Sequence, residues 1–261
     1  GDILTLLPGE YYPPETIKIS AKGESENPII IRGQQRHLSV LTSWEEANYQ
    51  WQKLPDKDFI YRAEGVSQAF AVTEVNSGLI LQAAPGLSDM SHFRATFFHD
   101  KEKQCLYLHC SDGQSPKKHR IRVTTRSGYI FAVNDAENLQ IKNLTFTGAN
   151  HEVPSESRFG SAVRVSSTTN ILIENCDFYF NSGGVYVSAR TKNPTVRNCF
   201  FKGNDGLGYS EMAQLFFHLS CSNCLAENNI VQDGRTHGIR FYSGAQNVTA
   251  RGNIIKNEDI G

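Results

Sequence analysis

The sequence predicts an all-β protein, a parallel β-helix interrupted by an inserted, mainly antiparallel β subdomain. The first observation is a repeat. Asparagine, two spacers, an aliphatic residue, a charge and a second asparagine recur, and glycine replaces the second asparagine in the last copy. The start-to-start spacings are 32, 23, 30 and 24 residues, and a period in this range is typical of a solenoid. The copies begin at Asn138, Asn170, Asn193, Asn223 and Asn247.

The second observation is the local pattern within each copy. Apolar residues alternate with a period of two and show no helical stripe, so each turn of the solenoid consists of strands and bends. The second asparagine of each copy keeps one register. We expect these side chains to stack from coil to coil inside the solenoid, at the strand spacing of about 4.8 Å. They are Asn143, Asn175, Asn198 and Asn228.

These motifs carry a resemblance to a known group of proteins. From Asn138 onward the chain resembles the right-handed parallel β-helix proteins, which include polysaccharide lyases and glycoside hydrolases. The opening GDILTLLPGEY at residues 1–11, followed by NPIIIRG at residues 27–33, resembles the first coil of chondroitinase B-like and related secreted members. The resemblance implies a protein that is secreted, periplasmic or located at the cell surface.

We expect three segments along the chain. Residues 1–39 form the first coil, with a turn at Pro8 and Gly9. Residues 40–126 contain no copy of the repeat, and their short β-like runs are separated by Gly, Pro and Asp, which indicates the antiparallel insert. Residues 127–261 form the remaining coils.

Composition and charge exclude several classes of function. The net charge is −1 at pH 7 and no run is polybasic, so no partnership with nucleic acid is expected. No run of 18 apolar residues exists, so no membrane span is predicted, and no signal peptide heads the sequence. Because the chain starts inside a coil and ends after the fifth repeat without a polar cap, we expect a fragment of a longer protein. The oligomeric state stays open.

The cysteines give no strong metal signal. Cys176 and Cys199 occupy the same repeat position and should be stacked neighbours, either as buried thiols or as a disulfide. Cys221 and Cys224 form a lone CxxC, for which free thiols or a turn disulfide are favoured over zinc. The sequence therefore predicts no metal and no cofactor.

The connections between coils predict a cleft. Long and short connections alternate at one corner of the solenoid, and the long ones span residues 147–161 and 202–213. Loops on a rigid scaffold commonly carry function. These two should form walls about 10 Å apart, because one coil lies between them.

The strand after this corner aligns in four coils and predicts a ligand-binding surface. Its aliphatic residues fill the core, so the alternate side chains form one outward column. Planar guanidinium groups suit carboxylate or sulfate, and exposed aromatic faces stack on sugar rings. The alternative is a solvated sheet face with incidental aromatic residues. The column contains Arg164, Tyr186, Phe216 and Arg240, with His218 and Tyr242 two positions further along their strands.

Residues near this column predict two kinds of chemistry. Hydrolysis of a glycosidic bond needs two carboxyl groups. β-Elimination instead needs a base beside C5 of a uronate and a cation that neutralises its carboxylate. The carboxyl candidates are Asp205, Glu211 and Asp233, the candidate bases are His237 and Tyr209, the candidate cations are Arg164 and Arg240, and Arg235 is a further substrate-binding candidate.

We therefore expect a carbohydrate-active enzyme that cleaves glycosidic bonds of a polysaccharide, by hydrolysis or β-elimination, with acidic sugars favoured by the arginines. The alternative is a non-catalytic carbohydrate-binding or cell-surface β-helix module. A structural spacer or adhesin is a third hypothesis. Two titratable groups that converge in the cleft would separate the enzyme from the other two, since fold analogy alone favours it.

Overall fold

The computed structural model describes residues 1–150, 161–204, 213–234 and 237–257. The chain divides into two compact units. Residues 1–43 and 128–261 form one, which we call the solenoid unit, and residues 44–127 form the other, which we call the inserted unit.

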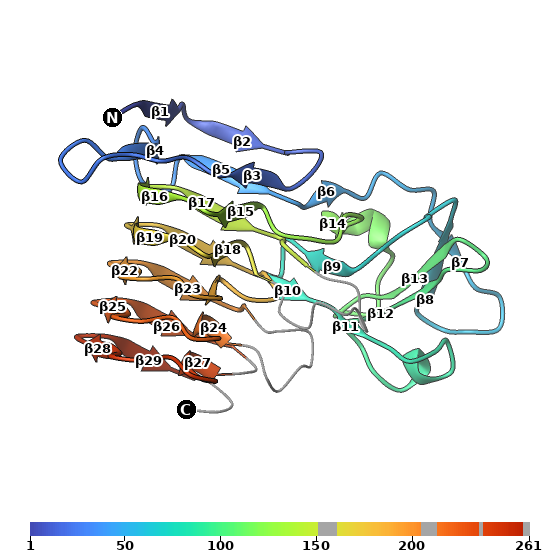
Figure 1. The fold of residues 1–261 in the computed structure, drawn as a ribbon. Coiled ribbons are helices and arrows are strands. Elements are labelled where there is room, and N and C mark those ends of the chain that lie inside the picture. Colours follow the sequence, from blue (N-terminus) through green and yellow to red (C-terminus); the bar gives the residue numbers. More distant parts are fainter. Residues whose placement is uncertain (151–160, 205–212, 235–236, 258–261) are drawn as a thin grey trace. The chain divides into compact units, whose positions relative to one another are not determined.

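Three parallel sheets make up the solenoid unit, and their strands lie coil upon coil (Figure 1). The first sheet contains β1 (Ile3–Leu6), β4 (Ile29–Gly33), β16 (Glu137–Lys142), β19 (Thr169–Glu174), β22 (Thr195–Arg197), β25 (Leu225–Glu227) and β28 (Thr249–Arg251). The second sheet contains β2 (Gly9–Tyr11), β5 (Ser39–Thr42), β17 (Thr145–Thr147), β20 (Asp177–Tyr179), β23 (Phe200–Lys202), β26 (Ile230–Gln232) and β29 (Ile254–Lys256). The third sheet contains β3 (Ile17–Ile19), β15 (Phe131–Asn134), β18 (Val163–Ser166), β21 (Val185–Ser188), β24 (Ala213–Phe217) and β27 (His237–Phe241). The predicted parallel β-helix is confirmed.

The second asparagine of each repeat forms the corner between the first and second sheets. The four residues keep one register, as expected, but their side chains are half-buried or exposed, so the predicted stack inside the solenoid is wrong. Their φ angles are 53–55°, so the chain turns sharply here in the left-handed region, which asparagine tolerates better than most residues. They are Asn143, Asn175, Asn198 and Asn228.

The first asparagine of each repeat forms the ladder instead. From Asn170 onward, each side-chain amide donates to the amide oxygen of the asparagine one coil earlier, at 2.8–3.1 Å. The ladder runs through Asn138, Asn170, Asn193, Asn223 and Asn247. It is exposed from the second member onward, so water competes for its hydrogen bonds.

Buried amides lie at positions that the sequence did not single out, Asn204 at the corner after β23 and Asn229 at the corner between β25 and β26. Asn204 accepts from the backbone N–H and the amide of Asn181, and its own amide donates to the carbonyl of Phe178 and to Gln214. Asn229 is likewise buried and donates to Val196. These amides satisfy bend backbone that no strand can pair, as buried polar groups require.

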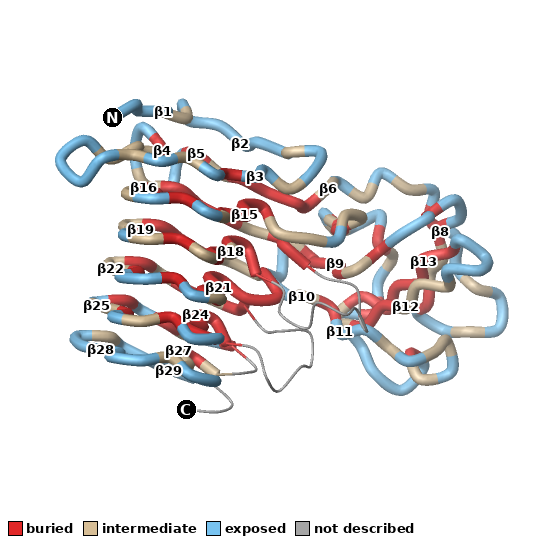
Figure 2. Tube along the Cα trace, in the orientation of Figure 1, coloured by how far each residue is buried: buried red, intermediate tan, exposed pale blue. Residues whose placement is uncertain are grey.

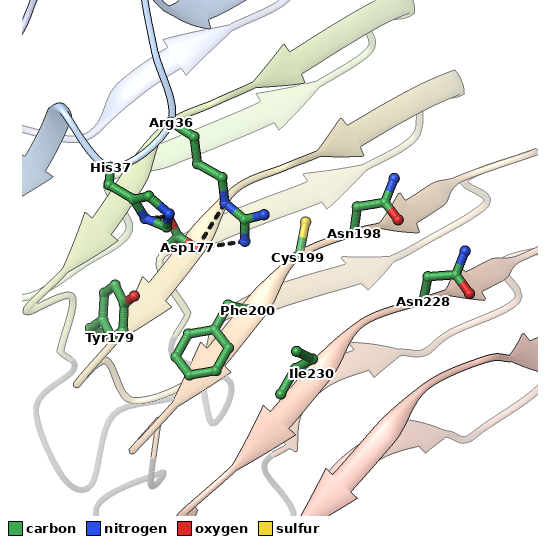
Figure 3. A pocket seen from close by; sticks show the side chains of 9 residues that line it. All are labelled: Arg36, His37, Asp177, Tyr179, Asn198, Cys199, Phe200, Asn228 and Ile230. Atoms are coloured by element: carbon green, nitrogen blue, oxygen red, sulfur yellow. Dashed lines mark hydrogen bonds and ion pairs between the residues drawn. The ribbon is translucent and has the colours of Figure 1, made fainter.

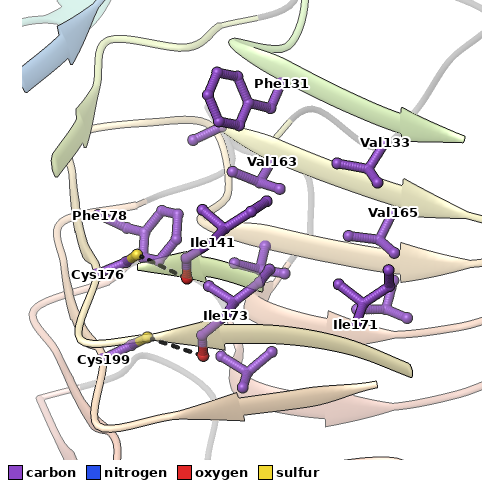
Figure 4. Close-up of a cluster of buried hydrophobic side chains, with 14 of the residues drawn as sticks. Phe131, Val133, Ile141, Val163, Val165, Ile171, Ile173, Cys176, Phe178 and Cys199 are labelled. Carbon is purple, nitrogen blue, oxygen red and sulfur yellow. Dashed lines mark hydrogen bonds between the residues drawn. The ribbon is translucent and has the colours of Figure 1, made fainter. Parts of the chain in front are cut away.

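The core of the solenoid is a stack of equivalent apolar side chains (Figure 4). Phe178 stacks on Phe146 at 5.3 Å and on Phe201 at 4.8 Å between ring centroids, one coil apart in each direction. Cys176 and Cys199 occupy equivalent positions as free, buried thiols, each directed at a core carbonyl. The expectation of two stacked thiols is confirmed.

The first coil extends further than expected. Gly9–Tyr11 is strand β2, so the predicted turn at Pro8 and Gly9 is wrong at its second residue. Strand β5 pairs with β2 and with β17, which places residues 40–43 in the solenoid and not in the insert. The physical reason is that β17 needs a backbone partner on its outer side, and Leu41 on β5 fills the core there.

The inserted unit contains two sheets and is mainly antiparallel, as predicted. One sheet contains β10 (Leu79–Ile80), β9 (Ala71–Glu74), β14 (Ile121–Thr124) and β6 (Glu45–Glu46). The other contains β11 (Gln82–Ala83), β12 (Thr96–Asp100), β13 (Cys105–His109), β8 (Ile60–Glu64) and β7 (Gln52–Lys53). A core of its own, which includes Trp51, Val72 and Phe97, lies within the unit.

Burial is deepest in the middle coils of the solenoid and in the interior of the inserted unit (Figure 2). Strands β28 and β29 are exposed throughout, and β1 and β2 are mostly exposed. The helices of the described residues are two three-residue 3-10 turns, η1 (Asp89–Ser91) and η2 (Pro116–Lys118), and neither could cross a bilayer.

The buried amides should contribute more to stability than the exposed ladder. We expect Asn204→Ala to lower the free energy of unfolding by roughly 2–4 kcal/mol, because it strands several buried donors and acceptors. Asn193→Gly is the matched control, since glycine tolerates the left-handed φ of 54° and water replaces the lost amide bonds; it should cost less than about 1 kcal/mol. Urea titration of both variants makes the comparison, and equal losses would contradict it.

Candidate functional site

The third sheet is positioned to carry the site because its strands follow the corner with unequal connections. Residues 148–162 and 203–212 connect the second sheet to β18 and β24, whereas residues 180–184 and 233–236 connect it to β21 and β27. The alternation of long and short connections is therefore present. Most of both long segments lies outside the described residues, so the cleft between them stays a prediction.

The predicted column on the third sheet is real. Parallel register aligns Arg164 with Tyr186, Tyr186 with Phe216 and Phe216 with Arg240, while the alternate residues point into the core. The expected exposure of the aromatic rings is wrong. Tyr186 is 4% exposed and Phe216 1%, and they pack with Ala213 in a small buried cluster separate from the solenoid core. Covering such rings removes an apolar surface that would be costly in water.

A hydrogen bond joins this column to the next one. The Tyr186 hydroxyl lies 2.9 Å from Nδ1 of His218, and both side chains are buried. Burial raises the pKa of Tyr186 to about 12, so its phenol stays protonated near neutrality and can donate to the imidazole. The sequence placed both residues on this face but could not show the contact, because it runs diagonally between columns.

Aromatic rings and guanidinium groups continue from this pair toward the surface. His218 stacks on Phe216 at 4.9 Å and on Tyr242 at 5.6 Å, and Tyr242 is 53% exposed. The guanidinium carbon of Arg240 lies 4.5 Å from the ring centre of Tyr242 and 5.3 Å from that of Phe216. Stacking of this kind restricts the orientation of an arginine and contributes about 0.5–2 kcal/mol.

Arg164 lies at the other end of the column. Its guanidinium carbon is 5.6 Å from the ring centre of Tyr129, and its side chain is half-buried, as is that of Arg240. The site therefore has a half-buried arginine at each end and a buried tyrosine and histidine between them.

The remaining predicted site residues divide into two groups. Asp233 is exposed at a corner with a φ of 57°, where Asn257 and Gln232 donate to it and Lys202 lies 3.5 Å away. His237 begins β27 and aligns with Ala213. The others, Asp205, Tyr209, Glu211 and Arg235, lie outside the described residues.

A hollow of about 500 Å³ lies on the second sheet (Figure 3). Its centre is Asp177, a fully buried carboxylate that the sequence did not single out. Arg36 Nη2 lies 2.8 Å from one carboxylate oxygen and His37 Nδ1 2.5 Å from the other. Arg36 neutralises this buried charge, and the contacts of Arg36 and His37 hold residues 34–38 at the entry to β5. We assign the cluster a structural role.

Comparison with known proteins identifies the fold family. The family model described as the right handed beta helix region matches residues 100–261, more than half of the chain. The chain belongs to this family. No curated protein sequence matches the chain.

Solved β-helix structures are similar to the chain at low sequence identity. XylC, solved in complex with xylose, has a TM-score of 0.62 and 12% identity over 99% of this chain and 57% of XylC. An alginate lyase from Paenibacillus sp. str. FPU-7 has a TM-score of 0.43 and 13% identity over 99% of this chain and 59% of the lyase. PfbA, a surface adhesin of Streptococcus pneumoniae, has a TM-score of 0.45 and 12% identity over 98% of this chain and 55% of the adhesin.

The family match and the XylC structure confirm the expected resemblance to right-handed β-helix proteins. At such identities the solved structures show the fold alone. The chain also spans little more than half the length of the structures it matches.

The hydrogen bond between Tyr186 and His218 leads us to predict that the effect of a Tyr186 variant on stability depends on pH. At pH 8 we expect Tyr186→Phe to lower the free energy of unfolding by about 1–3 kcal/mol, because a buried imidazole loses this partner. Unfolded tyrosine ionises near pH 10, whereas burial raises the pKa of folded Tyr186 to about 12. The wild type therefore loses stability from this group as the pH rises through that window, and its advantage over the variant should shrink by pH 11.

Urea titrations at pH 8 and pH 11 measure both differences. Tyr242→Phe, at an exposed position of the next column, is the control and should change stability little at pH 8. A Tyr186→Phe difference that stays constant between the two pH values would contradict the prediction.

Proposed function

We propose that the outer face of the third sheet binds an acidic glycan and that the protein cleaves its glycosidic bonds. The observation that carries this proposal is the arrangement of one column, in which half-buried Arg164 and Arg240 flank the buried Tyr186 and Phe216.

The arginines argue for an anionic ligand. A guanidinium group presents a planar fork of donors that matches a carboxylate or sulfate with two parallel hydrogen bonds. Arg240 is held between two aromatic rings, so less side-chain freedom is lost when it binds a ligand. Arg164 and Arg240 lie three strand spacings apart, about 14 Å, which suits two charged groups on one extended chain of sugars.

Of the two candidate reactions we propose β-elimination, because the arginines of the column can neutralise a uronate carboxylate. Hydrolysis would instead use a pair of carboxyl groups. Elimination needs one base and one cation: the base removes the C5 proton, the C4–O bond breaks, a C4=C5 double bond forms, and the leaving oxygen gains a proton. We assign the cation to Arg240; His237, at the corner where β27 begins, and Tyr209 are the candidate bases.

Binding is the first test of the proposal. We expect Arg164→Ala with Arg240→Ala to weaken binding of oligo-uronates at least about tenfold, since each charge-assisted hydrogen bond contributes about 1.5–3 kcal/mol. Arg251→Ala is the matched control, because this arginine lies on the first sheet and pairs with Glu227 at 2.6 Å. Neutral xylo-oligosaccharides serve as comparison ligands in the same titrations. Equal binding of acidic and neutral sugars, or an unaffected double variant, would overturn the acidic-glycan proposal.

Product analysis then tests the reaction. Release of an unsaturated uronate, detected by its ultraviolet absorbance, supports elimination, and its loss in His237→Ala with binding retained supports His237 as the base. New reducing ends without unsaturation would show hydrolysis instead. Binding without turnover would show a carbohydrate-binding module.

A further inference from the structure

A buried carboxylate in the inserted unit is hydrogen-bonded by neutral groups among the described residues. Glu74, the last residue of β9, is 0% exposed. Its carboxylate accepts from Ser77 Oγ at 2.9 Å, from the Ser111 N–H at 2.9 Å and from Ser111 Oγ at 2.6 Å, and the Cys110 thiol also bonds to it. All of these donors are neutral. Buried charges in proteins are normally paired with an opposite charge or bound to a metal.

Two further metal-ligating side chains meet Glu74. Cys110 follows β13 and is 0% exposed, and His119 precedes β14 with a side chain that is 12% exposed. One potential ligand atom from each of Glu74, Cys110 and His119 lies within 4.8 Å of the other two. A carboxylate, a thiol and an imidazole therefore converge at one point from three separate strand ends.

We propose that Glu74, Cys110 and His119 bind a zinc ion. Zinc accepts oxygen, nitrogen and sulfur ligands in one tetrahedral site, whereas calcium and magnesium bind oxygen ligands almost alone. Bond lengths of about 2.0–2.3 Å place tetrahedral ligand atoms roughly 3.3–3.7 Å apart, so side-chain shifts of the order of 1 Å complete the site. The fourth position is left for water.

The balance of charge supports the same assignment. When zinc binds, the Cys110 sulfur releases its proton to solvent and forms the metal bond. One carboxylate, one thiolate and one divalent cation then sum to zero, and a lone buried negative charge is replaced by a neutral site. A single monovalent cation could not balance both the carboxylate and the thiolate.

Neighbouring side chains hold the ligands in place. Asp112 Oδ1 lies 3.2 Å from Nε2 of His119, the carboxylate contact that fixes an imidazole ring when its other nitrogen binds a metal. Ser111 and Ser77 orient the Glu74 carboxylate through the hydrogen bonds given above. Supporting partners of this kind are typical of zinc sites.

The site would join the two sheets of the inserted unit. Glu74 and His119 adjoin β9 and β14 of the four-stranded sheet, whereas Cys110 extends β13 of the five-stranded sheet. Binding free energy at such a site adds to the stability of the fold that forms it. The proposed role is structural and independent of the glycan surface on the solenoid unit.

Metal analysis of the whole chain tests the proposal. We expect one zinc per chain after purification without chelator, and in the cobalt-substituted protein a thiolate-to-cobalt charge-transfer band. Cys110→Ser should lose both. Cys105→Ser, a buried cysteine on the same β13, and Cys221→Ser, from the CxxC pair of the solenoid, should keep both.

Thermal unfolding adds a readout that does not depend on spectroscopy. Zinc should raise, and a chelator lower, the melting temperature of the wild type, while Glu74→Gln should abolish this response. Asp112→Asn should weaken zinc binding about 10-fold to 100-fold, as the loss of an orienting partner does. Absence of zinc binding by the wild type at micromolar metal, or equal binding by Cys110→Ser, would overturn the proposal. Loss of the band in Cys221→Ser alone would assign the metal to the CxxC pair.

Discussion

Parallel backbone pairing between successive coils is the constraint on which the solenoid depends. Once one coil is in register with the next, every side chain falls into a column of equivalents, and each column has one environment. The columns of valine, isoleucine and phenylalanine fill the core, and the ring stack of Phe146, Phe178 and Phe201 shows how closely this repeats. Each coil closes through sharp corners, where its strands end. Asparagine in the left-handed region and buried amides such as Asn204 satisfy their backbone.

Because columns follow from the repeat, the sequence was sufficient to place residues on the third sheet. Alignment of the repeat put Arg164, Tyr186, Phe216 and Arg240 in one register, and the structure agrees. Exposure could not be obtained in the same way. Whether an outward ring such as Phe216 is covered depends on how Ala213, Tyr186 and His218 pack around it, and the period of the strand contains no information about that. The bond between Tyr186 and His218 was missed for a related reason, since it joins neighbouring columns through side-chain rotamers.

The asparagines show a different limit of sequence reasoning. Each repeat contains two, at fixed positions, and the sequence does not tell which one forms the ladder. The choice depends on side-chain direction: Asn170 and Asn175 both turn the chain in the left-handed region, but it is the Asn170 amide that donates to Asn138 in the preceding coil. The amides that satisfy buried backbone, Asn181 and Asn204, lie outside the repeat unit altogether. Their role can be recognised from the burial of their corner in the structure, because their spacing in the sequence does not distinguish them.

The two units therefore differ in what a sequence can reveal about their chemistry. In the solenoid, the residues of the proposed glycan-binding column recur with the period of the coil, so they can be found by alignment of the chain with itself. In the inserted unit, Glu74, Cys110 and His119 have no common spacing and come together through the pairing of β9 with β14 and the end of β13. The CxxC pair of Cys221 and Cys224 is the more conspicuous motif, and its two sulfurs lie 3.1 Å apart. Among the described residues, however, no further metal-ligating side chain joins them. Convergence in space, together with a buried charge that neutral groups hydrogen-bond among the described residues, is the stronger argument for a metal.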